Sequence, residues 1–111
     1  MEVRITDRHG RMTAAVKKYA IEKLEPLSRY WARTRYLEVV FDEAHLGWKI
    51  EAIAHVERGA PLVATVEHKD ALAAVDLAHD KIERLLTRAK ERVEEKRQGN
   101  ARGAGAGSGE R

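Results

Sequence analysis

A long helical stretch from Asp70 to Arg97 constrains the fold more than any other part of this 111-residue sequence. The stretch contains neither Gly nor Pro and is rich in Ala, Leu, Glu, Lys and Arg, which favour the α-helix. Its apolar residues recur every three or four positions, so they share one helical face and predict packing against a core. These apolar residues are Val75, Ala78, Ile82, Leu85, Leu86, Ala89 and Val93.

The charged residues of this stretch are sorted around the predicted helix. Basic residues form a stripe beside the apolar face, and acidic residues fall on the far side. Charged residues on a helix usually form a solvated face, but separation by sign favours a row of cations that is available to a partner. The stripe consists of Lys81, Arg84, Arg88 and Arg92, and the acidic residues are Asp76, Asp80, Glu83 and Glu94.

Charge is sorted along the whole chain as well. Residues 11–35 carry seven cations and two anions, and residues 81–97 carry seven cations and four anions. Residues 36–80, where strands are predicted, carry three cations and nine anions. The pattern indicates one basic and one acidic side, and a polyanion would be steered to the basic side.

Composition places the chain among soluble proteins with a single domain. Apolar residues make up 43% of the sequence and charged residues 35%, which is typical of a globular domain. The apolar runs are too short to span a bilayer, and the first residues lack the apolar segment of a secretion signal. We therefore expect a cytoplasmic protein with no membrane partner. The absence of Cys excludes disulfides and thiolate metal sites.

Shorter periodic segments predict four strands and one further helix. Val3 and Ile5 alternate with polar residues in a first strand, and Thr13 is a suitable N-cap for a helix that runs to about Glu25. Pro26 is expected to end or kink this helix. The remaining strands are predicted at Tyr36 to Glu43, Trp48 to Glu57 and Leu62 to His68.

This element order predicts an α+β fold, a two-layer β-α-β-β-β-α sandwich. The last three strands have short connections and should form an antiparallel meander, with both helices on the apolar face of a four-stranded sheet. Val40 and Ile53 are exceptions that fall on the outer face. Residues 1–97 form the predicted domain, and residues 98–111 are expected to be a disordered Gly- and Ala-rich tail.

The sequence shows no arrangement typical of catalysis or of metal binding. None of the five His residues lies in an HExxH-like spacing, and no Gly-rich phosphate loop lies between a strand and a helix. The two Ser residues have no evident Ser/His/Asp context. We therefore predict that the chain is not an enzyme and has no catalytic residue, metal, cofactor or small-molecule ligand.

Two segments carry a resemblance to a known family. Residues 70–90, DALAAVDLAHDKIERLLTRAK, are similar to the signature D-M-Y-x-A-I-D-x-x-x-D-K-L-x-R-Q-L-x-K-x-K. TAAVKKYAIEKLEPLSRYW is similar to the first helix of the same family, the ribosome hibernation-promoting factors of the S30AE or YfiA-like type. The resemblance covers residues 1 to about 97. The matching signature positions are Asp70, Ala74, Val75, Asp76, Asp80, Lys81, Ile82, Arg84, Leu86, Arg88 and Lys90.

The sequence also departs from this family pattern at several positions. Ala71 and Leu72 stand in place of the usual Met and Tyr, and Leu85 stands in place of Gln. Pro26 stands where Lys is frequent, so one expected cation is missing. No C-terminal module follows the domain, so the resemblance implies the short type of factor, which we expect to be monomeric off the ribosome.

The resemblance implies a non-enzymatic factor that binds the 30S subunit within the 70S ribosome. Such a factor occupies the channel where mRNA and the A- and P-site tRNAs would lie, and its helix cations contact phosphates of 16S rRNA. It thereby inhibits translation during stress or stationary phase. The implied rRNA-binding residues are Lys23, Arg29, Lys81, Arg84, Arg88 and Arg92, together with Lys17, Lys18, Lys90 and Arg33.

Two alternative functions remain open from the sequence. The first is a non-ribosomal module that binds structured RNA and resembles a double-stranded RNA-binding domain, because such domains share the helix, three-strand, helix core. The second is a regulatory interaction domain of the sigma-factor type that uses the acidic sheet face. Tight binding to free duplex RNA would favour the first, and an RNase-insensitive protein partner would favour the second.

Overall fold

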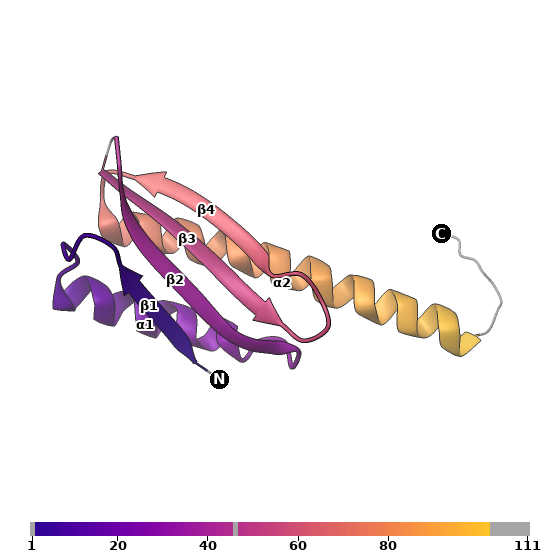
Figure 1. Cartoon of the computed structure of the whole chain (residues 1–111). Helices are drawn as coiled ribbons and strands as arrows, with labels where there is room; N and C mark the ends of the chain where they lie inside the picture. Colours follow the sequence, from indigo (N-terminus) through magenta and orange to yellow (C-terminus); the bar gives the residue numbers. More distant parts are fainter. Residues whose placement is uncertain (1, 46, 103–111) are drawn as a thin grey trace.

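The computed structural model describes the backbone of residues 2–45 and 47–102 and the side chains as far as residue 94. The predicted β-α-β-β-β-α order is confirmed, and the elements form two layers (Figure 1). None of the helices in the described residues is long and apolar enough to cross a membrane. In chain order the elements are β1 (Val3–Asp7), α1 (Ala14–Ser28), β2 (Thr34–Ala44), β3 (Gly47–Val56), β4 (Leu62–His68) and α2 (Ala71–Arg102).

The four strands form one mixed sheet in the order β1-β2-β3-β4. Strand β1 pairs with β2 in parallel, since α1 returns the chain to the same end of the sheet. The pairs β2–β3 and β3–β4 are antiparallel, which confirms the predicted meander. Both helices cover the same face of the sheet, and β4 is the edge strand beside α2 (Figure 1).

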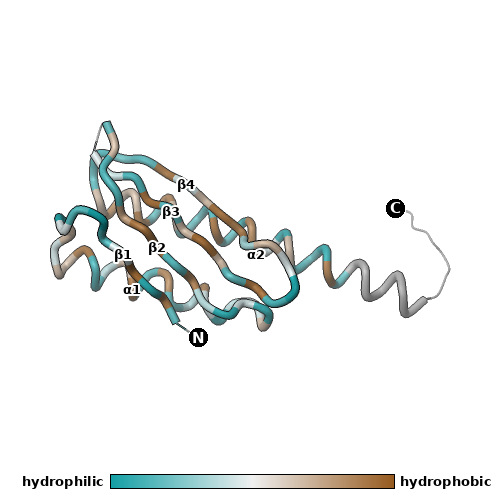
Figure 2. The backbone as a smooth tube through the Cα atoms, viewed as in Figure 1, coloured by the Kyte–Doolittle hydropathy of each residue, from teal (hydrophilic) through white to brown (hydrophobic). Residues whose placement is uncertain are grey.

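The core lies between the sheet and the two helices. Apolar and polar residues alternate along the strands (Figure 2). Successive side chains of a strand point to opposite faces, so one in two points toward the helices. The inward side chains of Leu37, Phe41 and Ile50 are almost completely buried, as are Ile82 and Leu86 of α2. The apolar stripe predicted for the long helix is therefore the face that anchors α2 to the sheet, and this orientation fixes where its cations point.

Helix α1 ends at Ser28, three residues beyond the end predicted from Pro26. Pro26 lacks an N–H group, but in the last turn this costs a single backbone hydrogen bond. The turn is completed around the proline, because the Ser28 hydroxyl donates to the Glu25 carbonyl at 2.7 Å. The Arg29 N–H also donates to the Pro26 carbonyl at 3.2 Å.

Helix α2 likewise extends past its predicted end. It runs to Arg102, so residues 98–102 of the predicted tail are helical. The rest of the predicted tail, residues 103–111, lies outside the described residues. Its disorder and the domain boundary at residue 97 therefore stay predictions.

The Asp7 carboxylate holds the turn between β1 and α1. Its Oδ1 accepts a hydrogen bond from the Gly10 N–H at 3.0 Å, and its Oδ2 accepts one from the Met12 N–H at 2.9 Å. The bond from Met12 is the largest cause that holds the pKa of Asp7 below its usual value of 3.8. A lowered pKa in the folded state means that the unfolded chain binds the proton more tightly.

We expect Asp7 to make the fold sensitive to acid. Its contribution to the free energy of unfolding is present above pH 3.8 and is lost as the pH falls through the lower pKa of the folded protein. The variant Asp7→Asn should therefore lose less stability than the parent between pH 5 and pH 2.5. Urea unfolding at these two pH values measures the difference, with Glu22→Gln on the exposed side of α1 as the control. Equal losses in Asp7→Asn and the parent would contradict the assignment.

Candidate nucleic-acid interface

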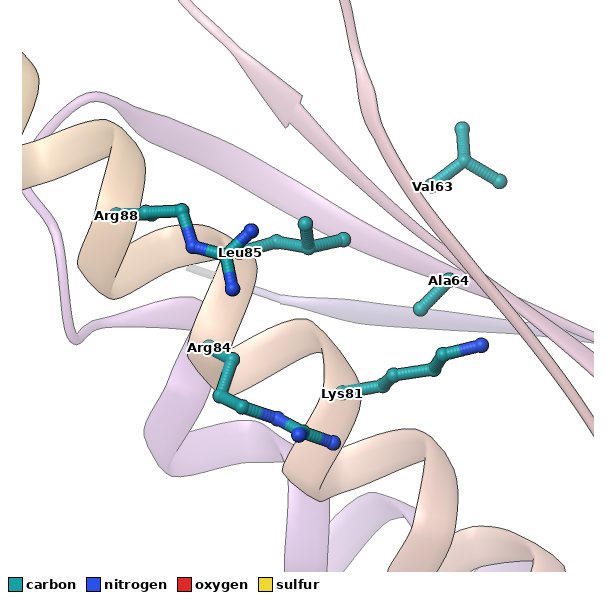
Figure 3. Close-up of a pocket in the computed structure, with 6 residues that line it drawn as sticks. All are labelled: Val63, Ala64, Lys81, Arg84, Leu85 and Arg88. Atoms are coloured by element: carbon teal, nitrogen blue, oxygen red, sulfur yellow. The ribbon is translucent and has the colours of Figure 1, made fainter.

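An open hollow lies between the β4 edge of the sheet and the basic stripe of α2 (Figure 3). Its volume is about 240 Å³. The helical wall consists of residues spaced three or four apart, so they line the same side of α2. On β4 the small side chain of Ala64 faces the helix, which leaves space that a larger residue would fill. The lining residues are Val63, Ala64, Lys81, Arg84, Leu85 and Arg88.

The three cations of the hollow are exposed and differ in how firmly they are held. Lys81 reaches toward β4, and its Nζ donates to the Thr65 carbonyl at 3.0 Å (Figure 3). An ammonium group has three N–H donors, so two remain available after this bond. Arg84 Nε makes a long 3.4 Å contact with the Asp80 carbonyl. Within the side chains that the structure describes, no carboxylate forms an ion pair with Lys81, Arg84 or Arg88.

One acidic residue of α2, Asp76, has partners on α1, and a second, Asp80, has a partner on α2 itself. Asp76 accepts a hydrogen bond from the Tyr19 hydroxyl at 2.5 Å and lies 3.7 Å from Lys23 Nζ. Asp80 is bonded to His79 at 3.0 Å. This bond is the largest cause of the lowered pKa of Asp80, and the charges of Lys23 and Arg84 contribute less. Asp76 is therefore held toward α1, and Asp80 is held by its neighbour His79.

The two helices run in the same direction and pack side by side. Tyr19 contacts Asp76 and Tyr30 contacts Thr87, and both pairs are 57 residues apart. A constant separation requires parallel helices. Lys90 lies over the ring of Tyr30 at 5.0 Å from its centroid. Of the predicted site residues, Lys23 and Lys90 thus lie at the seam between the helices and not at the hollow.

The other predicted site residues are distributed around the domain. Arg29 forms an ion pair with Glu25 at 2.8 Å, and Arg33 is half-buried in the connection that leads to β2. Lys17 and Lys18 are exposed on the first turns of α1. Arg92 is also exposed and follows Arg88 by four residues, so it continues the basic stripe beyond the hollow. The structure therefore brings together Lys81, Arg84 and Arg88, and does not bring the α1 cations into the same hollow.

The β4 wall of this site was missed by sequence reasoning. Val63 and Ala64 were assigned only as strand residues, because neither carries a functional group. A weak signal was present, since Ala64 is the small residue between the larger inward positions Leu62 and Val66. The turn of α2 that lies opposite Ala64 is set by packing between segments that are distant in the sequence. The sequence pattern alone therefore does not reveal this wall.

One cluster of possible metal ligands lies on the acidic side of α2. Ligand atoms of His79, Asp80 and Glu83 lie within 4.8 Å of one another. His79 already bonds Asp80, and both carboxylates are exposed, so an ordinary solvated helix surface accounts for the cluster. The expectation that no metal binds stays a prediction.

Sequence comparisons place the chain beside ribosome-associated proteins. Residues 3–94 match the family model described as Sigma 54 modulation protein / S30EA ribosomal protein. The ribosome hibernation promoting factor of Azotobacter vinelandii is 39% identical over 99 residues, which cover 89% of this chain and 92% of that protein. The factor of the same name from Pseudomonas putida is 32% identical over 101 residues, which cover 91% and 98%.

Solved structures share the fold. The N-terminal domain of Thermus thermophilus Protein Y superposes with a TM-score of 0.66 at 26% identity, over 79% of this chain and 98% of that one. A ribosomal subunit interface protein from Coxiella burnetii superposes with a TM-score of 0.72 at 21% identity, over 82% and 99%. The two-layer arrangement of four strands and two helices is thus found in proteins whose names refer to the ribosome or to Protein Y.

Proposed function

The chain belongs to the ribosomal S30AE family, and from this membership we propose that it binds the small ribosomal subunit and inhibits translation as a ribosome hibernation factor. The membership agrees with the prediction that the chain is not an enzyme. Two relatives at 39% and 32% identity that bear the name ribosome hibernation promoting factor support the proposal. It would act in the cytoplasm, where ribosomes are found.

The observation that carries this proposal is the set of three cations around the hollow. Lys81, Arg84 and Arg88 are exposed on one side of a helix that is anchored by a buried face. Cations on a rigid element bind phosphate oxygens and so fix the position and orientation of the protein on the RNA. These contacts do not read base edges. Specificity for one place on the ribosome then comes from the shape of folded RNA, as is usual for structured RNA.

The proposed mechanism is exclusion. The chain would lodge in the channel of the 30S subunit, within the 70S ribosome, and occupy the space of mRNA and of the A- and P-site tRNAs. Arg92, the α1 cations and the residues at the seam between the helices would add contacts to 16S rRNA around the hollow. A single domain with a preformed basic face can do this as a monomer, without a second module.

A competition experiment tests this function. Purified chain should co-sediment with 30S subunits and reduce the binding of initiator tRNA and mRNA to them in proportion to its occupancy. Binding to free duplex RNA as tight as binding to 30S subunits would favour the alternative of a general structured-RNA module. Co-sedimentation without loss of mRNA and tRNA binding would contradict the exclusion mechanism.

Replacing Arg88 by Gln is expected to weaken the salt dependence of binding. Each phosphate contact that is lost should lower the slope of log K against log salt by about one unit, because fewer counterions are released on binding. Titrations with 30S subunits between 50 and 200 mM KCl measure this slope. Arg35→Gln, at an exposed position outside the hollow, is the matched control and should keep the parent slope. An unchanged slope for Arg88→Gln would remove Arg88 from the contact surface.

A further inference from the structure

We propose that the hollow between β4 and α2 receives one unstacked nucleotide of the bound RNA, with its base or ribose against Leu85 and Ala64. The flanking phosphates would lie on Lys81, Arg84 and Arg88. This inference rests on the proposed function and assigns a more specific ligand to the same site. The predicted role of the stripe, contact with phosphate, makes no use of the apolar residues in the hollow.

The lining of the hollow does not suit a phosphate alone. Half of its residues are apolar, namely Val63, Ala64 and Leu85. Leu85 is half-buried and Ala64 faces α2 from the edge strand, whereas the Val63 side chain points away from α2 (Figure 3). A phosphate group gains nothing from such a surface, whereas a base or ribose removes apolar area from water on both sides of the contact. Unstacked bases are also the usual targets in proteins that recognise single-stranded parts of folded RNA.

The cations are placed to hold a nucleotide at both of its ends. Lys81 is fixed toward β4 by its bond to the Thr65 carbonyl, and Arg88 lies two turns further along α2. Seven residues of helix span about 10 Å, which is enough for one nucleotide and its two flanking phosphates. In Figure 3 Leu85 lies between these two cations, on the side of α2 that faces β4.

On the outer face of the sheet, Tyr36 is not available for stacking with a base. Tyr36 is the aromatic residue that points outward there, and the Arg4 guanidinium lies 3.7 Å from the centroid of its ring. The His55 ring stacks on Tyr36 at 4.4 Å with an angle of 19° between the planes. Two groups that both lie over one ring must occupy opposite faces, so Tyr36 has no free face for stacking.

The test compares apolar and cationic variants in the same binding assay. Leu85→Ala and Leu85→Ser both remove the apolar side chain from the hollow. Each is expected to weaken binding to 30S subunits about 5- to 10-fold, as for the loss of one apolar contact. The slope of log K against log salt should stay at the parent value, since no phosphate contact is removed. Leu72→Gln, at an exposed leucine of α2 far from the hollow, is the control and should bind within about twofold of the parent.

A second readout identifies the nucleotide itself. Base-specific chemical probing of 16S rRNA should show one nucleotide whose reactivity changes when the parent chain binds and reverts with Leu85→Ala. Parent-like affinity for both Leu85→Ala and Leu85→Ser would overturn the inference. If Arg84→Gln still weakened binding and lowered the slope, the proposed function would stand without the nucleotide. If the parent chain did not bind 30S subunits, the proposed function itself would fail.

Discussion

Reversing Arg84 and Arg88 together to Glu is expected to abolish co-sedimentation of the chain with 30S subunits while its circular-dichroism spectrum stays native. Both side chains are exposed, and neither forms an ion pair among the described side chains, so the fold loses little. A hydrogen bond to a charged group contributes about 1.5 kcal/mol or more, so two lost contacts weaken binding about 100-fold or more. The introduced carboxylates add repulsion from RNA phosphates, which should take binding below detection.

The matched control reverses two cations away from the hollow. Arg35 and Lys69 are exposed, and the pair Arg35→Glu with Lys69→Glu changes the net charge by the same amount. This control should retain most of its binding, which separates a local contact surface from a general effect of net charge. Equal loss in both double variants would mean that attraction is non-specific. Retained binding of the Arg84 and Arg88 variant would mean that the hollow is not the contact surface.

The second large effect is expected at Gly47, the first residue of β3. Gly47 has φ of +140°, a backbone conformation that residues with a side chain rarely adopt. A Cβ atom there would lie 2.5 Å from the Lys69 Cα and 3.0 Å from the His68 carbonyl oxygen. Because these are backbone atoms, they cannot move aside without displacing the end of β4. We expect Gly47→Ala to lower the free energy of unfolding by about 2–4 kcal/mol.

Thermal unfolding measures this effect, with Gly59→Ala as the matched control. A loss of that size should lower Tm by roughly 10 °C or more in a domain of this length. At Gly59 a Cβ would meet the Val56 Cγ2 at 3.6 Å, which is ordinary contact. Gly59→Ala should therefore change stability by about 0.5 kcal/mol at most, or raise it slightly by restricting the unfolded chain. Similar Tm values for the two variants would contradict the close approach at Gly47.

The layers and element order of this fold were predictable because its periodic segments are unambiguous. The long helix repeats its apolar positions over many turns, and each strand alternates apolar and polar residues. The end of α1 was predicted less well, because the rule for Pro26 is strongest in a helix interior and weaker in a last turn. The roles of Ser28 in closing that turn and of Gly47 beside Lys69 depend on tertiary neighbours.

The candidate site was likewise predictable from the sequence only in part. Helical spacing alone placed Lys81, Arg84 and Arg88 together, and the structure has them on one side of α2. The wall formed by Ala64 could not be predicted, because it depends on which turn of α2 lies opposite which residue of β4. The separation of Lys23 from this group was equally hidden. It follows from the parallel packing of α1 and α2, which directs Lys23 toward Asp76.

A cryo-electron microscopy map of the chain bound to 30S subunits is the most direct test of the central claim. The account predicts that the domain occupies the mRNA channel, with the side formed by α2 and the β4 edge against 16S rRNA and phosphates beside Lys81, Arg84 and Arg88. A map with the outer face of the sheet against the RNA, or with the domain outside the channel, would contradict it.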